Sequence, residues 1–209
     1  MLVCDNTFAT CLIQNPLELG ADFVMHSSTK FYGGHSDILG GLVVANTKSE
    51  ISDRIRLYQK TAGAVPAPFD CWLLNRSIAT FAMRVKQQNE NAMKIATFLE
   101  NHAAIEKVFY PGLASHKNHH LAAKQMIGGF GSIISVLVKA DEVSTLKLAS
   151  SFKLIKHATS LGGVESLVEH RRSVEGDNPL SPINLLRFSI GIEFVDDLIL
   201  DLEEGFRGI

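Results

Sequence analysis

The chain has 209 residues, of which 46% are hydrophobic and 20% are charged, with 20 basic and 22 acidic side chains. This composition is typical of globular proteins rather than disordered ones, and a formal net charge of −2 gives no electrostatic basis for binding nucleic acid. The longest apolar runs, such as Ile133 to Val138, are far too short to cross a bilayer, so no membrane partner is expected.

The cysteines and the first residues bear on the compartment. Cys4, Cys11 and Cys71 show neither a metal-binding nor a CxxC spacing. Met1 to Asp5 contains neither the basic nor the apolar segment of a signal peptide. The sequence therefore predicts reduced thiols and a cytoplasmic location.

The first third of the chain alternates short apolar runs with glycine and polar turns, which is typical of buried parallel strands. Strands are predicted at Met1–Cys4, Phe23–His26 and Leu42–Ala45. Residues Ser49 to Gln59 have helical spacing, with Ser49 as the N-cap. A loop rich in helix-breaking residues, Thr61 to Pro68, follows this helix.

A long helical pattern runs from Phe69 to His102, with apolar residues at every third or fourth position. A single periodicity over more than about 25 residues is unusual for one helix of a globular protein. We therefore expect a kinked connector between two domains, residues 1–86 and 87–209, with the boundary near Arg84 to Gln88.

Beyond the connector the pattern is that of an α+β domain. Its predicted strands are Lys107–Tyr110, Ser132–Val138, His157–Ser160 and Asn184–Ile190, and its predicted helices are Asp141–Ser151 and Phe194–Gly205. The polar segment from Arg171 to Ile183 is predicted to be a loop. His116, His119 and His120 have no nearby cysteine or carboxylate, so they are expected to begin a surface helix and no metal site is predicted.

The residues around Lys30 carry the strongest chemical signal. An apolar run, Ala21 to Met25, leads into the hydroxyls of Ser27, Ser28 and Thr29, then Lys30, then glycines. Burial lowers the pKa of an amine because desolvation disfavours the charged form, and the neutral amine is the nucleophile. Hydroxyls and open backbone suit a phosphate group. An imine-forming lysine beside a phosphate site is what pyridoxal 5′-phosphate (PLP) requires.

Four collinear segments resemble blocks of the Cys/Met metabolism PLP-dependent enzymes, the family of cystathionine γ-synthase, cystathionine γ- and β-lyases and methionine γ-lyase. The segments are Asp5–Thr10, Met25–Gly41, Ser160–Leu167 and Leu186–Glu193. The resemblance implies an α/β fold of fold type I, the aspartate-aminotransferase-like class. Residues 1–86 would be the C-terminal half of its PLP-binding large domain, and residues 87–209 its α+β C-terminal small domain.

The resemblance implies a cofactor site made of Asp5, Ser27, Thr29 and Lys30. Lys30 would form the imine and then move protons at the substrate Cα, and Asp5, as a buried carboxylate, would keep the pyridine nitrogen protonated. Ser27 and Thr29 would contact the phosphate, whereas Ser28 is expected to pack. From the residues alone, a cap role for Asp5 and local backbone hydrogen bonds for the hydroxyls remain open.

The resemblance also implies a substrate site. Arg187 lies in an apolar strand, where a charge needs a partner, and its guanidinium suits bidentate capture of the substrate α-carboxylate. Ser160 and Leu161 would line the pocket, and Glu165 would face the distal amino group of a long substrate. The alternatives are an ion pair of Arg187, with Glu193 as the candidate partner, and a surface position for Glu165.

The implied function is a PLP-dependent transsulfuration enzyme that acts on sulfur amino acids or activated homoserine. Imine formation at Lys30 would lead to γ-elimination or γ-replacement, and Glu165 favours a γ-synthase or γ-lyase. A cystathionine β-lyase or a methionine γ-lyase is the alternative. The expected partners are a small amino-acid substrate and, as in the intact family, further copies in a homodimer or homotetramer.

The chain begins directly on the Asp5 segment, so the resemblance implies that the front portion of the family is absent. That portion supplies the tyrosine stacked on the cofactor and the glycine-rich phosphate loop. We therefore expect an unpaired sheet edge, weak PLP binding and poor catalysis by this polypeptide alone. A non-catalytic remnant or one half of a split enzyme is the alternative from another class. The segment Arg171 to Asp177 also lacks the SMTH-type sequence of the family, which leaves the particular activity open.

Overall fold

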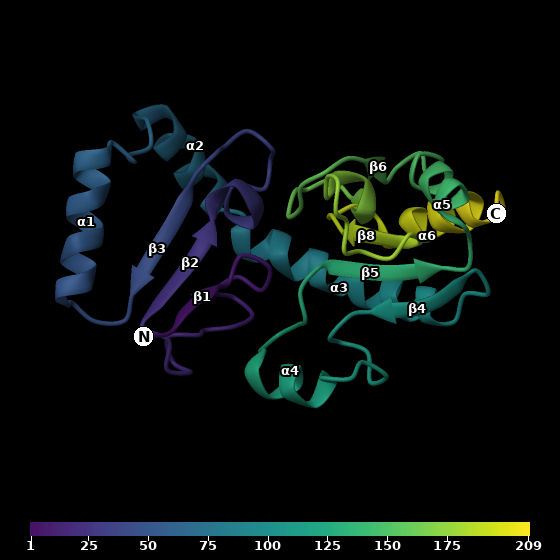
Figure 1. The fold of residues 1–209 in the computed structure, drawn as a ribbon, viewed down its shortest axis with the longest axis horizontal. Helices are drawn as coiled ribbons and strands as arrows, with labels where there is room; N and C mark the ends of the chain where they lie inside the picture. Colours follow the sequence, from purple (N-terminus) through teal and green to yellow (C-terminus); the bar gives the residue numbers. More distant parts are fainter.

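The computed structural model describes residues 1–209, which form two β-sheets joined by a long helix (Figure 1). The first sheet has the order β1-β2-β3, with strands Val3–Asp5, Phe23–Ser27 and Gly41–Ala45. The second sheet has the order β4-β5-β8-β7-β6, with strands Ile105–Phe109, Ile133–Val138, Leu185–Ser189, Leu167–His170 and Lys156–His157. The chain combines two mixed sheets with six α-helices, so the predicted α/β class is confirmed.

The first sheet differs from the prediction of three buried parallel strands. β2 is parallel to β1 but antiparallel to β3, and Ser27 at the end of β2 faces Gly41 at the start of β3. The connecting segment, residues 28–40, forms a turn and a loop at one end of the sheet and does not cross it, so β3 runs back along β2. The central strand β2 is largely buried, whereas Val3 of β1 and Val43 of β3 are exposed.

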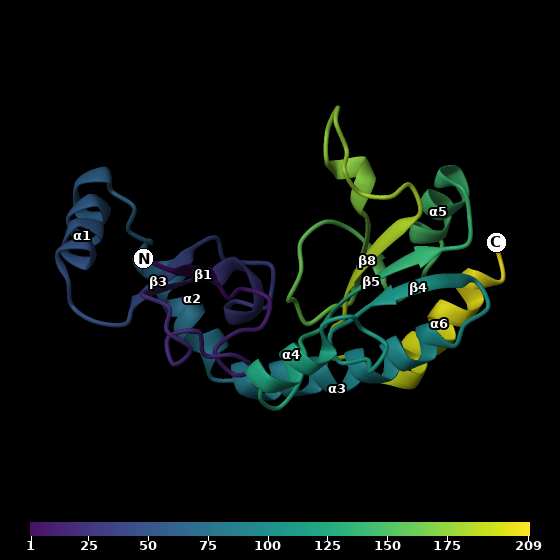
Figure 2. The ribbon, with the colours of Figure 1, turned by 60° about the horizontal axis from the view of Figure 1, so that its bottom comes forward.

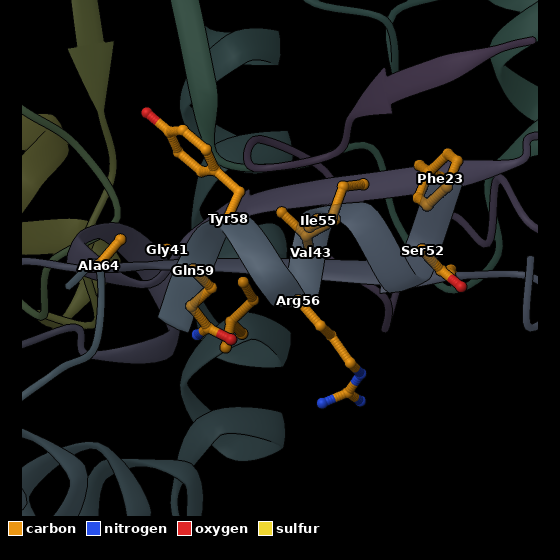
Figure 3. A pocket seen from close by; sticks show the side chains of 11 residues that line it. Phe23, Gly41, Val43, Ser52, Ile55, Arg56, Tyr58, Gln59 and Ala64 are labelled. Atoms are coloured by element: carbon orange, nitrogen blue, oxygen red, sulfur yellow. The ribbon is translucent and has the colours of Figure 1, made fainter. Parts of the chain in front are cut away.

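Helix α1 (Glu50–Ala62) confirms the predicted helix and its cap. The Ser49 side chain accepts a hydrogen bond from the backbone N–H of Ser52, and the helix ends at Gly63, whose φ is 71°. No residue of α1 is buried. A hollow of about 590 Å³ separates the helix from β2 and β3, and Figure 3 shows the side chains of Val43 and Ile55 in this space.

The predicted kinked connector consists of two helices, α2 (Pro68–Ile78) and α3 (Phe81–Glu100). The break lies at Ala79 and Thr80, a few residues before the predicted boundary at Arg84 to Gln88. Because α3 is continuous through Arg84 and Gln88, the division into residues 1–86 and 87–209 stays a prediction. In Figure 1, α3 extends from the first sheet to the second.

The second sheet confirms most of the predicted C-terminal elements, which include helices α4 (His119–Gln125), α5 (Glu142–Ala149) and α6 (Val195–Phe206). Strand β7 was not predicted, because it is only four residues long and carries Glu169 and His170 among its buried side chains. In place of the strand predicted at residues 157–160, the structure has the two-residue strand β6 (Lys156–His157), and Ser160 lies in the loop that follows it.

The second sheet encloses the main core. Its cluster of 22 buried hydrophobic residues contrasts with a cluster of six beside the first sheet, at the Lys30 turn and the start of α3. Figure 2 shows α3 and α6 along one face of the second sheet and α5 on the opposite side. No helix in the structure combines the length and apolar character needed to span a membrane.

Candidate functional site

Lys30 lies in a tight turn that follows the buried strand β2. The turn, η1 (Ser28–Tyr32), has a π-type hydrogen bond from Gly33 N–H to the Ser28 carbonyl, and its helical geometry breaks at Lys30, where φ is −90° and ψ is −122°. The half-buried Lys30 Nζ donates a hydrogen bond of 2.8 Å to Ser160 Oγ. The turn therefore directs the lysine amine across to a loop that is 130 residues later in the chain.

The Ser160 loop packs tightly against the lysine turn. Ser160 has a φ of 89°, which is rare for a residue other than glycine, and Leu161 is buried in the same small cluster as Phe31. A Cβ on Gly162, whose φ is 78°, would lie 2.8 Å from the backbone nitrogen of Phe31. Only glycine allows this approach, and the approach places Ser160 beside Lys30.

Arg187 on β8 reaches the same loop from the second sheet. Its Nη2 donates to the Ser160 carbonyl at 3.3 Å and to Glu169, the residue directly opposite it on β7. Burial lowers the pKa of Arg187, and the charge of Glu169 opposes this effect. The ion pair suggested with Glu193 is wrong, because Glu193 accepts hydrogen bonds from the backbone N–H and hydroxyl of Ser166 instead.

Asp5 is exposed at the end of β1, whereas a buried carboxylate was expected. Its Oδ1 accepts hydrogen bonds from the backbone N–H of Thr7 at 3.0 Å and from the Thr7 hydroxyl at 2.6 Å. Oδ2 has no hydrogen-bond partner in the protein and can accept from a ligand. Asp5 is exposed because β1 is an edge strand of the first sheet.

The three hydroxyls after β2 differ in their surroundings. Ser27 is half-buried, and its hydroxyl makes no hydrogen bond to the protein, whereas its backbone N–H donates to Thr7 Oγ1 at 2.8 Å. Ser28 is buried, as expected. Thr29 Oγ1 accepts from the Gly40 N–H at 3.0 Å, so this hydroxyl already stabilises the loop before β3. Ser27 is therefore the freer of the two predicted phosphate ligands.

Glu165 lies five residues after Ser160, in the same connection between β6 and β7, and is half-buried rather than fully exposed. Its Oε1 accepts a hydrogen bond of 2.9 Å from the hydroxyl of Ser36, in the loop that follows the lysine turn. The backbone N–H of Val164 donates to the Gly34 carbonyl beside it. Two loops from different sheets therefore meet at Glu165.

Two buried polar residues of α3, Arg84 and Gln88, also belong to the site and were not predicted. Arg84 donates to the carbonyls of Phe31 at 2.9 Å and Tyr32 at 3.3 Å, and burial lowers its pKa. Gln88 donates to the Gly163 carbonyl at 2.7 Å. The available signal was their spacing, since two polar residues four positions apart on an apolar helix face lie side by side.

The site as a whole consists of two linked groups. Lys30, Ser160 and Arg187 form one chain of contacts, and Asp5 is linked to Ser27 through Thr7. An amine, a guanidinium, a free carboxylate oxygen and a free hydroxyl together can bind a molecule that carries both a carbonyl and anionic groups.

Comparison with known proteins identifies the family. The Cys/Met metabolism PLP-dependent enzyme family matches residues 1–207, and the chain belongs to this family. It is 44% identical to cystathionine gamma-synthase of Mycobacterium tuberculosis, in an alignment that covers 98% of the chain and 53% of that protein. It is also 44% identical to cystathionine beta-lyase of Coxiella burnetii, with 96% of the chain and 54% of that protein covered.

Among solved structures, metB from Corynebacterium glutamicum matches with a TM-score of 0.94 and 44% sequence identity. The match covers 99% of the chain and 54% of the metB chain. The chain thus spans about half the length of the curated relatives that it matches. The fold is that of part of a PLP-dependent transsulfuration enzyme, as the sequence predicted.

The residues present fit the cofactor of this family. Lys30 offers a primary amine in the turn after a buried strand, and Asp5 keeps one oxygen free for a protonated ring nitrogen. The Ser27 hydroxyl is available to a phosphate oxygen. The donor set therefore matches an aldehyde, a pyridinium and a phosphate, which are the three groups that PLP presents.

Proposed function

We propose that this chain carries the lysine, ring-nitrogen and substrate-carboxylate sites of a transsulfuration enzyme that acts on sulfur amino acids or activated homoserine. The contact between Lys30 Nζ and Ser160 Oγ, with Arg187 on the carbonyl of the same serine, is the observation that carries the proposal. It joins an amine nucleophile to a carboxylate-binding guanidinium through one residue, so both ends of an α-amino acid have a binding group.

Each residue has a separate part in this proposal. Lys30 would hold the cofactor covalently through Nζ, Asp5 Oδ2 would accept from its ring nitrogen, and Ser27 and Thr29 would contact its phosphate. When bound, the cofactor supplies an electron sink that acidifies the substrate Cα–H. The protein binds and orients the substrate and moves its protons. The first of these steps places the substrate within reach of Lys30.

The substrate would be held by its carboxylate. Arg187 binds that carboxylate, and the Ser160–Leu161 loop forms the wall between the carboxylate and Lys30. Lys30 Nζ then moves protons at Cα and at the neighbouring carbon, because a free amine in contact with the Ser160 hydroxyl stays oriented toward the substrate. Leu161 is buried and keeps water from this wall.

Glu165 is the basis for proposing which bond of the substrate is broken. A half-buried carboxylate close to the loop of Ser36 suits the distal ammonium of a long substrate and favours a γ-synthase or γ-lyase. Sequence identity does not separate the branches, because a gamma-synthase and a beta-lyase both match at 44%. Cystathionine β-lyase and methionine γ-lyase are therefore the alternatives, and assays of cystathionine synthesis and cleavage distinguish them.

We also propose the homodimeric or homotetrameric assembly and the cytoplasmic location that the family resemblance implies. The exposed apolar side chains of α1 favour assembly, because apolar surface is stabilised when it is buried against a partner. Sedimentation of the purified chain with and without PLP tests the assembly. A monomer under both conditions would contradict it for this polypeptide.

The first test of the function is borohydride reduction of the purified chain in the presence of PLP, followed by peptide mapping. We expect the label on the peptide that contains Lys30, and no label at that peptide in the Lys30→Ala variant. Lys48→Ala is the matched control, since this lysine lies on the exposed segment after β3 and should leave labelling unchanged. Label distributed over surface lysines, with none on Lys30, would contradict the proposal.

A second candidate is a chain that becomes active only with further polypeptide. The observation in its favour is the apolar surface on Val3, Val43 and Leu57, which lies on both edge strands and on α1. Mixing the chain with the N-terminal half of the Corynebacterium protein tests this candidate. A gain of Lys30 labelling on mixing supports it, and equal labelling with and without the second half contradicts it.

A further inference from the structure

Glu169 is a buried acidic residue that has no role in the proposed function. Its side chain is only 4% exposed, and it lies on β7 directly opposite Arg187. One carboxylate oxygen contacts Arg187 Nη2, and the other accepts from Arg171 Nη1 at 2.5 Å. A buried carboxylate is costly unless it is paired, and this one is paired with two arginines from the same sheet region.

The arrangement leaves Arg187 with unused donors. A guanidinium has five N–H groups, and Arg187 uses only Nη2, toward Glu169 and the Ser160 carbonyl. Nε and Nη1 make no hydrogen bond to the protein. Because Glu169 and the Ser160 carbonyl fix Nη2, the plane of the guanidinium is held in one orientation, and Nη1 and Nε are left as separate donors for an anion.

The negative charge of Glu169 is shared between two arginines. A single buried Glu169–Arg187 pair would be neutral and would attract a second carboxylate only weakly. Arg171 contributes a further positive charge, so these three side chains sum to +1. Glu175 contacts Arg171 Nε at 3.4 Å and brings the sum of the four side chains to zero, but its side chain is 19% exposed against 4% for Glu169, so solvent screens its charge more.

We propose that Glu169 is a positioning residue that holds Arg187 for the α-carboxylate of the substrate, with Arg171 as the counter-charge that leaves Arg187 attractive to an anion. This inference rests on the proposed role of Arg187, and it adds two residues outside the four family-like segments. The Glu169→Gln variant would weaken this positioning, because the negative charge is lost and one of the two arginines would face the amide NH2 group instead of an acceptor oxygen.

The test measures carboxylate binding at Arg187 without requiring cofactor or turnover. The chain is treated with phenylglyoxal, which modifies arginine, and the rate at Arg187 is read by peptide mapping at increasing propionate concentration, with propionamide as the uncharged control. In the unmodified sequence we expect propionate, and not propionamide, to protect Arg187. In Glu169→Gln the propionate concentration for half-protection should rise about tenfold, since a hydrogen bond to a charged group is lost.

Three further variants distinguish positioning from support of the fold. Glu169→Asp keeps the charge and should restore part of the protection. Arg171→Gln leaves the Arg187 contact but removes the counter-charge, so it should also weaken protection. Glu175→Gln is the control of opposite sign, because it removes a carboxylate from Arg171 without touching Arg187, and its protection should be at least as strong as that of the unmodified sequence.

The outcomes separate this inference from the proposed function. Unchanged protection in both Glu169→Gln and Arg171→Gln, or no protection in the unmodified sequence, would overturn the inference whether or not Lys30 is labelled by PLP. Loss of Lys30 labelling with protection of Arg187 intact would overturn the proposed function and leave the carboxylate site in place. If Glu169→Gln does not fold, the Arg171→Gln result decides.

Discussion

The two sheets of this chain are packed to very different extents. The five-stranded sheet and its helices enclose 22 buried hydrophobic residues, and α6 alone buries Leu198 and Leu202 completely. Around the three-stranded sheet the buried cluster has six residues, and α1 buries none. The proposed site uses both parts, with Lys30 from the thinly packed region and Arg187 from the well-packed one. The position of Lys30 therefore depends on contacts with its neighbour.

The largest expected effect tests the difference in packing directly. Leu198→Ala in the buried face of α6 should lower the free energy of unfolding by about 3 kcal/mol, because it removes buried methyl groups and leaves a cavity. Leu57→Ala on exposed α1 should change it by about 0.5 kcal/mol or less. Urea denaturation of both variants measures the effects, and equal losses would contradict the contrast.

A smaller effect is expected where the two regions meet. Arg84→Met should lower the free energy of unfolding by about 2 kcal/mol, because buried carbonyls, including those of Phe31 and Tyr32, lose their donor. It should also reduce PLP labelling of Lys30, since the turn is no longer held. Arg76→Met, on the exposed face of α2, is the matched control for the loss of charge. An Arg84 variant with full stability and labelling would show that the lysine turn keeps its conformation without the Arg84 hydrogen bonds.

The thinly packed region should also respond to pH in the near-neutral range. His26 on β2 is buried with no partner for Nδ1, and burial lowers its pKa below 6.5, although the charge of Asp5 opposes this. Below pH 6.5 the unfolded chain binds a proton that the folded chain resists, so stability falls as pH falls. His26→Phe should flatten the curve between pH 7 and 5.5, as measured by thermal unfolding. An unchanged slope would contradict this.

The smallest effect is expected at acid pH, in the loop that follows β7. Hydrogen bonds from Ser181 and Leu180, with the charge of Arg171, hold the pKa of Glu175 at about 2. The stabilisation is present above pH 4.5 and is lost as pH falls toward 2. Glu175→Gln should therefore be less stable than the unmodified sequence at pH 7 and differ little at pH 2.5. Urea midpoints at the two values measure this, and a constant difference would contradict it.

Local patterns in the sequence predicted the elements whose determinants are close in the chain. Helix α1 begins at Ser49 because that side chain caps Ser52 three residues later, and β2 is a run of apolar residues bounded by polar ones. The turn after β2 could be anticipated from the hydroxyls and glycines beside Lys30. Its approach to Ser160 was expected only from the family resemblance.

The remaining features depend on contacts between distant segments. The direction of β3 depends on where the preceding loop leaves the sheet, and the partner of Arg187 depends on the register between β7 and β8. Alternation along one strand cannot show that Glu169 lies opposite Arg187. The burial of Arg84 could not be predicted either, because its partners are backbone carbonyls, which carry no sequence signal.

The positions of Arg84 and Gln88 on α3 restrict how the site can open. They lie one helical turn apart, about 6 Å along the axis, and hold the lysine turn and the Ser160 loop respectively. A rigid helix segment therefore keeps these two walls at a constant separation. Arg84 also donates to the Ser77 carbonyl near the end of α2, so α2 is tied to the same part of α3. The lysine turn and the loop that orients its amine therefore share one support, and neither can shift without disturbing α3.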